Sequence, residues 1–160
     1  MGHNKLPPES VSVKDWLEKR GFTPQIKLLD TMAHTAAEAA SALDCELGQI
    51  AKSLVFYQVQ SNQPVLIIVS GANRVDKQLV GDYLGTKIKT AGLEYVLETT
   101  GFPVGGVPPV AHKSHLRTLL DRDLLAFRQV WAAAGHSLTL FPIPPDQLIR
   151  LTRAEAIAVA

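Results

Sequence analysis

Lys52 stands at the start of an apolar stretch, where its ammonium could take part in chemistry. Residues 53–59 are mainly apolar, aromatic or β-branched, residues 65–69 form a continuous apolar run, and residues 61–64 are turn formers. This pattern predicts a β-hairpin. The lysine either runs along the sheet with its ammonium in water, which spacing alone favours, or points into a cleft and holds a phosphate or a polarised carbonyl oxygen. Ser53 beside it is either an ordinary strand serine or a hydroxyl in the same cleft.

The stretch GFPVGGVPPVAH, residues 101–112, is the second candidate for chemistry. Its three glycines and three prolines argue against a helix or a central strand and predict a loop of fixed shape. Gly105 and Gly106 allow positive φ and close backbone approach, so their N–H groups could converge on an oxygen as in an oxyanion hole. An ordinary rigid surface turn fits the same composition.

The segment HKSHLR, residues 112–117, is the densest basic patch of the chain, and Arg122 and Arg128 follow it. Such a run is usually a solvated face, and Asp121 and Asp123 dilute this one. Contact with a phosphate is the alternative interpretation.

Signatures of other chemistries are missing from the sequence, which has no GxGxxG after a strand, no P-loop, no HExxH and no GxSxG. Of the histidines only His112 and His115 are close together, and no cysteine or carboxylate stands beside them at metal spacing. We therefore expect neither a metal site nor a cofactor. Asp44 and Glu46 flank the single cysteine, Cys45, and should raise its pKa, which favours a packing role.

The length of 160 residues and the hydrophobic content of 46% fit one domain with a proper core. We expect residues 1–9 to form a flexible tail and residues 10–160 to form the domain. The formal charge of +1 gives no global basic field, so DNA binding is not expected and any RNA contact must be local. No apolar run is long enough for a membrane span or a signal core, which predicts a cytoplasmic protein without membrane contact.

Helices and strands are predicted to alternate irregularly along the chain. The expected helices cover residues 12–20, 35–44, 76–84, 93–100 and 145–151, with a last short helix capped by Thr152; the expected strands cover residues 25–30, 53–59, 65–69, 86–90, 116–120, 127–132 and 138–143. Because several strands are joined by short turns, the pattern indicates an α+β domain with a mixed, curved or barrel-like sheet flanked by helices.

Three segments together resemble the YbaK/prolyl-tRNA synthetase-associated (EbsC-like) domain family of aminoacyl-tRNA deacylases. They are ALDCELGQIAKSLVFY, GFPVGGVPPVAH and AAAGHSLTLFPIPPDQLIRLT, and the match extends from about residue 13 to about residue 152. The Lys-Ser-Leu-Val-Phe strand and the Gly105-x-x-x-Pro109 loop are fairly specific to the family when both occur in this order. The fold of the family is a mixed barrel-like sheet flanked by helices, in agreement with the prediction above.

The resemblance implies hydrolysis of the ester that joins a wrong amino acid to the terminal ribose of a tRNA, most often tRNA for proline, with prolyl-tRNA synthetase as a candidate partner and no cofactor. Positioning and oxyanion stabilisation can suffice for such an activated ester. Lys52 matches the functional lysine of the family and would hold the carbonyl oxygen, the ribose or the terminal phosphate. The expected site consists of catalytic Lys52, Gly105 and Gly106 and substrate-binding Ser53, Pro109 and His112.

The sequence leaves the preferred amino acid open among Ala, Cys, 2-aminobutyrate, Ser and Thr. A cysteine-selective branch should carry an acidic residue in the strand after the late glycine turn, but residues 137–139 are Ser-Leu-Thr. Two other functions are kept as alternatives: a non-catalytic module that binds aminoacyl-tRNA or a synthetase, and a hydrolase of another small acyl ester.

Overall fold

The computed structural model describes residues 5–160. Its helices are α1 (Pro8–Glu18), α2 (Ala36–Leu43), α3 (Lys77–Leu84), α4 (Leu93–Thr100) and α5 (Pro145–Thr152), with short 3₁₀ turns η1 (Leu47–Gln49) and η2 (Arg122–Ala126). Its strands are β1 (Lys27–Leu28), β2 (Ile50–Gln58), β3 (Pro64–Ser70), β4 (Ile88–Thr90), β5 (Arg117–Asp121), β6 (Val130–Ala133), β7 (Thr139–Ile143) and β8 (Glu155–Ile157).

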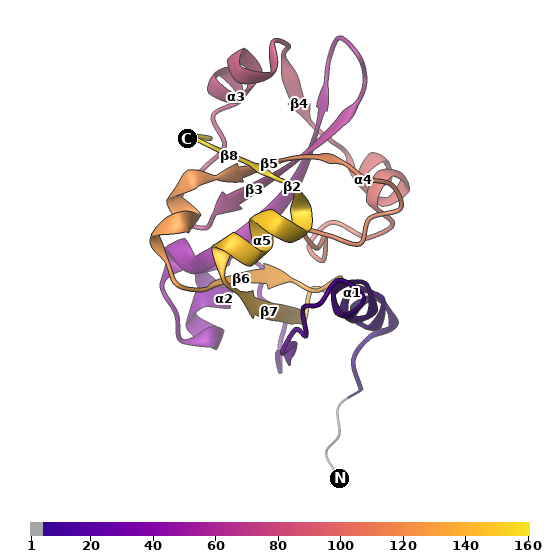
Figure 1. Cartoon of the computed structure of the whole chain (residues 1–160), viewed down its shortest axis with the longest axis vertical. Helices are drawn as coiled ribbons and strands as arrows, with labels where there is room; N and C mark the ends of the chain where they lie inside the picture. Colours follow the sequence, from indigo (N-terminus) through magenta and orange to yellow (C-terminus); the bar gives the residue numbers. More distant parts are fainter. Residues whose placement is uncertain (1–4) are drawn as a thin grey trace.

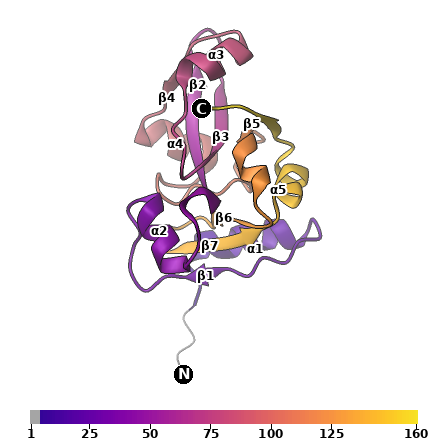
Figure 2. The same ribbon diagram turned by 90° about the vertical axis from the view of Figure 1, so that its left-hand side faces the viewer.

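Across the described residues, eight strands form one mixed sheet in the order β1-β7-β6-β2-β3-β5-β8, and β4 pairs with β2 beside this path. The pairs β2·β6, β3·β5 and β5·β8 are parallel, and the other pairs are antiparallel. The sheet is strongly twisted, so that β6 and β7 cross β2 and β3 at a steep angle (Figures 1 and 2). The predicted α+β class with a mixed sheet and flanking helices is confirmed.

The central strand β3 is buried on both faces, as its apolar run predicts. On one face Leu66 and Ile68 join the main core, to which α1, α4, α5 and the loop of residues 101–112 contribute. On the other face Ile67 and Val69 pack with α3. Helix α2 covers Ile50 at the far end of β2, in a separate small cluster. The second face of the sheet is therefore covered at its two ends by different helices.

The N-terminal helix begins earlier than predicted. α1 starts at Pro8, since proline is well tolerated in the first turn, and the Ser12 hydroxyl donates to Glu9 O instead of capping a helix. Pro8 and Glu9 thus belong to a helix and not to a tail, and Met1–Asn4 lie outside the described residues. Over residues 5–160 no helix combines the length and apolar content needed to cross a membrane.

The prediction of a last helix capped by Thr152 is wrong. The Thr152 hydroxyl donates to Leu148 O within α5, and Arg153 adopts a left-handed conformation (φ 57°) that ends this helix. The chain then forms β8, which pairs in parallel with β5. A strand of three residues forms because of the neighbouring strand it pairs with. It is too short to show an alternating hydrophobic pattern in the sequence, so it could not be predicted.

Candidate functional site

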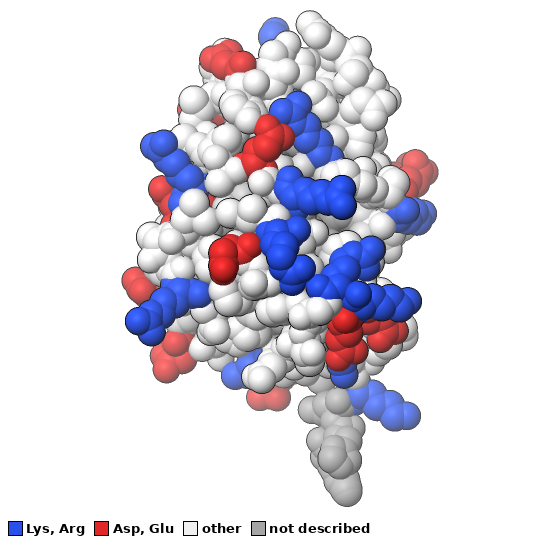
Figure 3. Space-filling view, in the orientation of Figure 1, with Lys and Arg blue, Asp and Glu red and all other residues white. Residues whose placement is uncertain are grey.

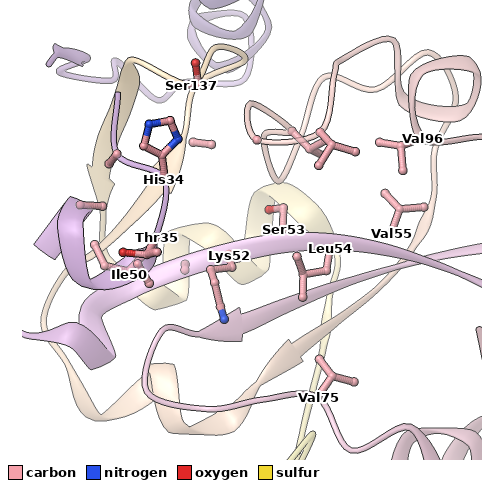
Figure 4. A pocket seen from close by; sticks show the side chains of 18 of the residues that line it. His34, Thr35, Ile50, Lys52, Ser53, Leu54, Val55, Val75, Val96 and Ser137 are labelled. Atoms are coloured by element: carbon pink, nitrogen blue, oxygen red, sulfur yellow. The ribbon is translucent and has the colours of Figure 1, made fainter. Parts of the chain in front are cut away.

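A cavity of about 550 Å³ opens beside the middle of β2. Its walls come from α2 and the turn before it, from β2, from the segment after β3, from the loop of residues 101–112 and from the turn between β6 and β7 (Figure 4). Its charged lining residues are basic, and no carboxylate lines it among residues 5–160. The cavity therefore suits a ligand that carries negative charge or accepts hydrogen bonds.

The cavity exists because the edge of β2 is interrupted. On the side away from β3, β6 pairs with Ile50 and Ala51, and β4 pairs with residues 56–58. Between these two partners, no strand of the described chain pairs with this edge at residues 52–55, which we call the β2 window. An unpaired strand edge offers main-chain donors and acceptors to a ligand.

The main-chain groups of Ser53 point into the β2 window. Gly71 N–H donates to Ile50 O (2.7 Å) on the β3 side, whereas Ala91 N–H donates to Val55 O (3.2 Å) on the opposite side. Main-chain direction alternates along a strand, so Ser53 shares the direction of Val55. No hydrogen bond within residues 5–160 takes up its N–H or C=O.

The Ser53 hydroxyl also lacks a partner in the part of the chain that the structure describes, although its oxygen is shielded from solvent. A buried hydroxyl without a hydrogen bond is unfavourable, and in native proteins it calls for a missing partner. Ser53 thus offers three polar groups to the cavity: its N–H, its C=O and its hydroxyl.

Lys52 lines the same cavity from the other face of β2. In Figure 4 Lys52 and Leu54 lie on one side of the strand and Ser53 on the other. α2 packs over Ile50 and the α3 cluster includes Phe56, so the positions between them are left uncovered by either helix. Of the two positions that the sequence left open for Lys52, the structure has the one at a cleft, and this position follows from the gap between α2 and α3.

Burial, and after it the charge of Arg74, lower the pKa of Lys52 below its ordinary value. Arg74 and Lys77 line the cavity on this side as well. Like charges held close together are an arrangement that a bound anion stabilises. This side of the cavity can accordingly hold a phosphate or a carbonyl oxygen.

A carboxylate network fixes the segment that carries Arg74. Asn73 Nδ2 donates to Asp121 Oδ2 (2.9 Å) and to Asp123 Oδ2 (2.8 Å), and Ser70 N–H donates to the same Asp121 oxygen (3.0 Å). Asp121 is almost fully buried at the end of β5. The acidic residues that dilute the basic patch in the sequence thus help to position a cation of the site.

The loop of residues 101–112, which we call the glycine loop, contains two glycines near the cavity that have different roles. Gly105 lines the cavity at φ +97°, and a Cβ built on it would touch nothing within 4 Å. Gly106 N–H donates to Pro103 O (3.1 Å), and a Cβ there would lie 2.9 Å from the backbone of Gly135 and His136. The N–H of Gly106 is therefore occupied within the loop, and its lack of a side chain lets the loop touch the β6–β7 turn.

Pro109 and His112 lie on the other side of this loop. They line a second cavity, of about 320 Å³, together with the ends of α1 and α5. His112 Nε2 donates to Pro108 O (2.7 Å), since a carbonyl can only accept. The structure thus brings Lys52, Ser53 and Gly105 to one cavity, and Pro109 and His112 to another.

Two histidines of the first cavity had no signal in the sequence. His34 comes from the turn before α2, and His136 follows Gly135 in the β6–β7 turn. Leu138 N–H donates to His136 Nδ1 (3.0 Å), which assigns the proton of the neutral ring to Nε2. Only the tertiary contact with Gly106 brings His136 to the site, so no local pattern could have marked it.

Comparisons with known proteins agree on one family. The family model described as the aminoacyl-tRNA editing domain matches residues 31–151. The chain is 30% identical over 119 residues to the uncharacterised protein YwhH of Bacillus subtilis, covering 74% of this chain and 75% of YwhH. It is 26% identical over 124 residues to EbsC of Enterococcus faecalis, a candidate Cys-tRNA(Pro)/Cys-tRNA(Cys) deacylase, covering 76% of this chain and 75% of EbsC.

A solved structure extends this likeness over nearly the whole chain. The crystal structure of a candidate trans-editing enzyme for prolyl-tRNA synthetase superposes with a TM-score of 0.92 at 41% identity, covering 97% of this chain and 98% of that one. The matched family region contains β2, the glycine loop and the β6–β7 turn, which build the first cavity. The resemblance seen in the sequence is thereby confirmed: the chain belongs to the aminoacyl-tRNA editing domain family, and these matches support aminoacyl-tRNA deacylase activity.

Proposed function

We propose that this protein removes a small wrong amino acid from tRNA for proline, acting in trans on the ester at the terminal ribose. Deacylation of aminoacyl-tRNA is the activity of its family. The identities of the tRNA and of the amino acid are what we propose beyond this activity. We also propose that the reaction takes place in the cytoplasm. The observation that carries the proposal is the β2 window, where Ser53 presents polar groups without a partner in the described chain to a cavity that Lys52 and Gly105 also line.

Ester hydrolysis requires a water molecule to attack the carbonyl carbon and requires donors for the oxyanion that forms. Two main-chain N–H groups at the cavity, those of Ser53 and Gly105, have no hydrogen-bond partner within residues 5–160. We assign them to the carbonyl oxygen, together with the Ser53 hydroxyl. As the tetrahedral intermediate collapses, the ester C–O bond breaks and the ribose oxygen takes up a proton.

The cations at the other side of β2 fit the nucleotide end of the substrate. Lys52 and Arg74 would hold the phosphate or the ribose of the terminal adenosine, which places the ester over the β2 window. Relief of the repulsion between the two cations would add to binding.

The amino acid itself would meet mostly small and apolar side chains. Ala33, Ala36 and Ala39 line the cavity. Ser137 and Thr139, at the end of the β6–β7 turn and the start of β7, also line it and belong to the segment where a cysteine-selective branch should carry an acid. With no carboxylate in the lining of the described residues, the Ser53 C=O is the group assigned to the substrate amino group. These features favour alanine, 2-aminobutyrate, serine or threonine over cysteine.

The test is a panel of tRNA for proline charged separately with Pro, Ala, Cys, Ser, Thr and 2-aminobutyrate, with ester loss followed over time. We expect selective loss of one of the small species other than cysteine. Preferential loss of the Cys ester would overturn the assignment of specificity. If no species is lost above the spontaneous rate but tRNA still binds, the protein is a recognition module, and activity on simple acyl esters without tRNA would indicate a general esterase.

A further inference from the structure

Every ionisable residue that lines the second cavity, among those the structure describes, is basic. It lies between the end of α1, the segment after Pro108 and the end of α5, and has a volume of about 320 Å³. The basic residues that line it are Arg20, His112, Lys113, His115 and Arg153, and none of its lining residues within the described chain is acidic. Figure 3 shows Lys and Arg side chains gathered on the face that carries α5. A cavity of this composition suits an anion.

The arginines and the lysine of this cavity form no ion pair with a carboxylate in the described part of the chain. Arg117 and Glu155 form the only ion pair among residues 5–160, and neither lines this cavity. Lys113 and Arg153 are exposed, without a carboxylate partner in the described part of the chain. Their charge is thus available to a ligand.

Arg20 is held in place for such a contact. Its guanidinium carbon lies 3.6 Å from the centre of the Trp16 ring, and Nη1 donates to Trp16 O (3.0 Å). A guanidinium has five N–H donors, so most remain for a second partner. A stacked, oriented arginine is a typical phosphate-binding group.

His112 closes the inner wall of this cavity. Burial lowers its pKa, the hydrogen bond to Pro108 raises it, and the charge of His115 lowers it further. Its Nε2 is taken by Pro108 O, which fixes the ring against the glycine loop. The Nε2 proton of His112 is therefore not available to an anion, and the positive charge of the cavity comes mainly from Arg20, Lys113 and Arg153.

The two cavities share the glycine loop as a wall. Gly105 and Val107 line the first cavity, and Pro109 and His112 line the second. A tRNA that places its terminal ribose in the first cavity brings further backbone phosphates close to the protein surface. The second cavity lies on the other side of the glycine loop, where it could meet one of them.

We propose that the cavity lined by Arg20, Lys113 and Arg153 binds a backbone phosphate of the tRNA, outside the pocket that holds the aminoacyl ester. This inference rests on the proposed function for the identity of the RNA. It concerns binding alone, so it can be tested with uncharged tRNA in the absence of any deacylation.

The test measures the affinity of uncharged tRNA for proline over a series of salt concentrations, with the double variant Lys113→Gln/Arg153→Asn. Both side chains are exposed, and Asn tolerates the left-handed conformation at position 153, so melting curves should match the wild type. We expect about 10-fold weaker binding and a salt slope shallower by about 2, one for each cation removed. Lys27→Gln is the matched control, because Lys27 is an exposed cation that lines neither cavity, and it should bind as the wild type does.

Unchanged affinity and salt slope in the double variant would overturn the proposal. A second arm adds inorganic phosphate at ionic strength matched with chloride. Phosphate should weaken tRNA binding to the wild type more than chloride does, and this difference should disappear in the double variant. Phosphate that binds the wild type but not the double variant, while both proteins bind tRNA equally well, would assign the cavity to free phosphate and overturn the proposal. Because deacylation is measured separately, a wild type that binds through this cavity without turnover would refute the proposed function and leave this inference standing.

Discussion

At the scale of single residues, Lys52 combines a charge with partial burial beside a second cation. Burial and Arg74 both lower its pKa, so the folded state holds this proton less tightly than the unfolded chain does. The charge of Lys52 therefore does not add to the stability of the fold, which is consistent with the proposed role of this residue in binding. Ser53 is also unfavourable for stability, because its shielded hydroxyl lacks a hydrogen-bond partner in the described chain.

Replacing Lys52 with Met should therefore raise the free energy of unfolding at pH 7, by no more than about 1 kcal/mol because the ammonium keeps contact with solvent. Between the lowered pKa and the ordinary value of 10.5, the unfolded state binds more protons than the folded state. The free energy of unfolding of the wild type should accordingly rise with pH across this pH range. Its difference from the free energy of unfolding of Lys52→Met should therefore become smaller. Denaturant unfolding at several pH values measures the stability difference at pH 7 and its change with pH. A variant less stable than the wild type at pH 7 would refute this account.

Ser53→Ala should leave the protein as stable as the wild type or more stable by about 1 kcal/mol, since it removes a shielded hydroxyl without a partner in the described chain. Deacylation should fall about 10-fold or more, because the ester oxygen then has one donor fewer. Thermal unfolding and single-turnover ester loss test the two parts together. Loss of stability with unchanged turnover would show that Ser53 is an ordinary strand serine.

At the scale of elements, the glycine loop separates two cavities and is held against the β6–β7 turn by Gly106. Gly106→Ala places a Cβ 2.9 Å from that backbone, so the loop must shift, with an expected loss of about 1–3 kcal/mol in stability and a clear loss of turnover. Gly92→Ala is the control, because Gly92 has φ −78° and open space around its Cβ position. Similar behaviour of the two variants in unfolding and turnover assays would contradict this role.

Elements with local signals were predictable. α2 begins after Thr35, whose hydroxyl accepts from Glu38 N–H, and α4 spans residues 93–100 and ends at Gly101, as the sequence predicts. The β2 window was not predictable, because it depends on where β4 and β6 stop along β2. For the same reason the sequence identified Lys52 and Gly105 as site residues but could not show that His112 lies at a different cavity. It also could not show that His136 lies at the first cavity.

At the scale of the whole molecule, the net charge of +1 conceals a local concentration of cations. Lys52, Arg74 and Lys77 line the first cavity, and Arg20 and Lys113 are among the basic residues of the second. The sequence prediction that any RNA contact must be local is consistent with this arrangement. A surface of this kind binds RNA through few phosphates, so tRNA affinity should depend on salt only moderately.

The central claim is best tested by single-turnover hydrolysis of alanyl-tRNA for proline with excess enzyme, comparing the wild type with Lys52→Ala. Alanine represents the small substrates that the cavity favours. The wild type should clear the ester well above the spontaneous rate, and Lys52→Ala should lose about 100-fold or more of this rate while its melting curve stays intact. Equal rates in the two proteins would contradict the assignment of the β2 window and Lys52 as the editing site.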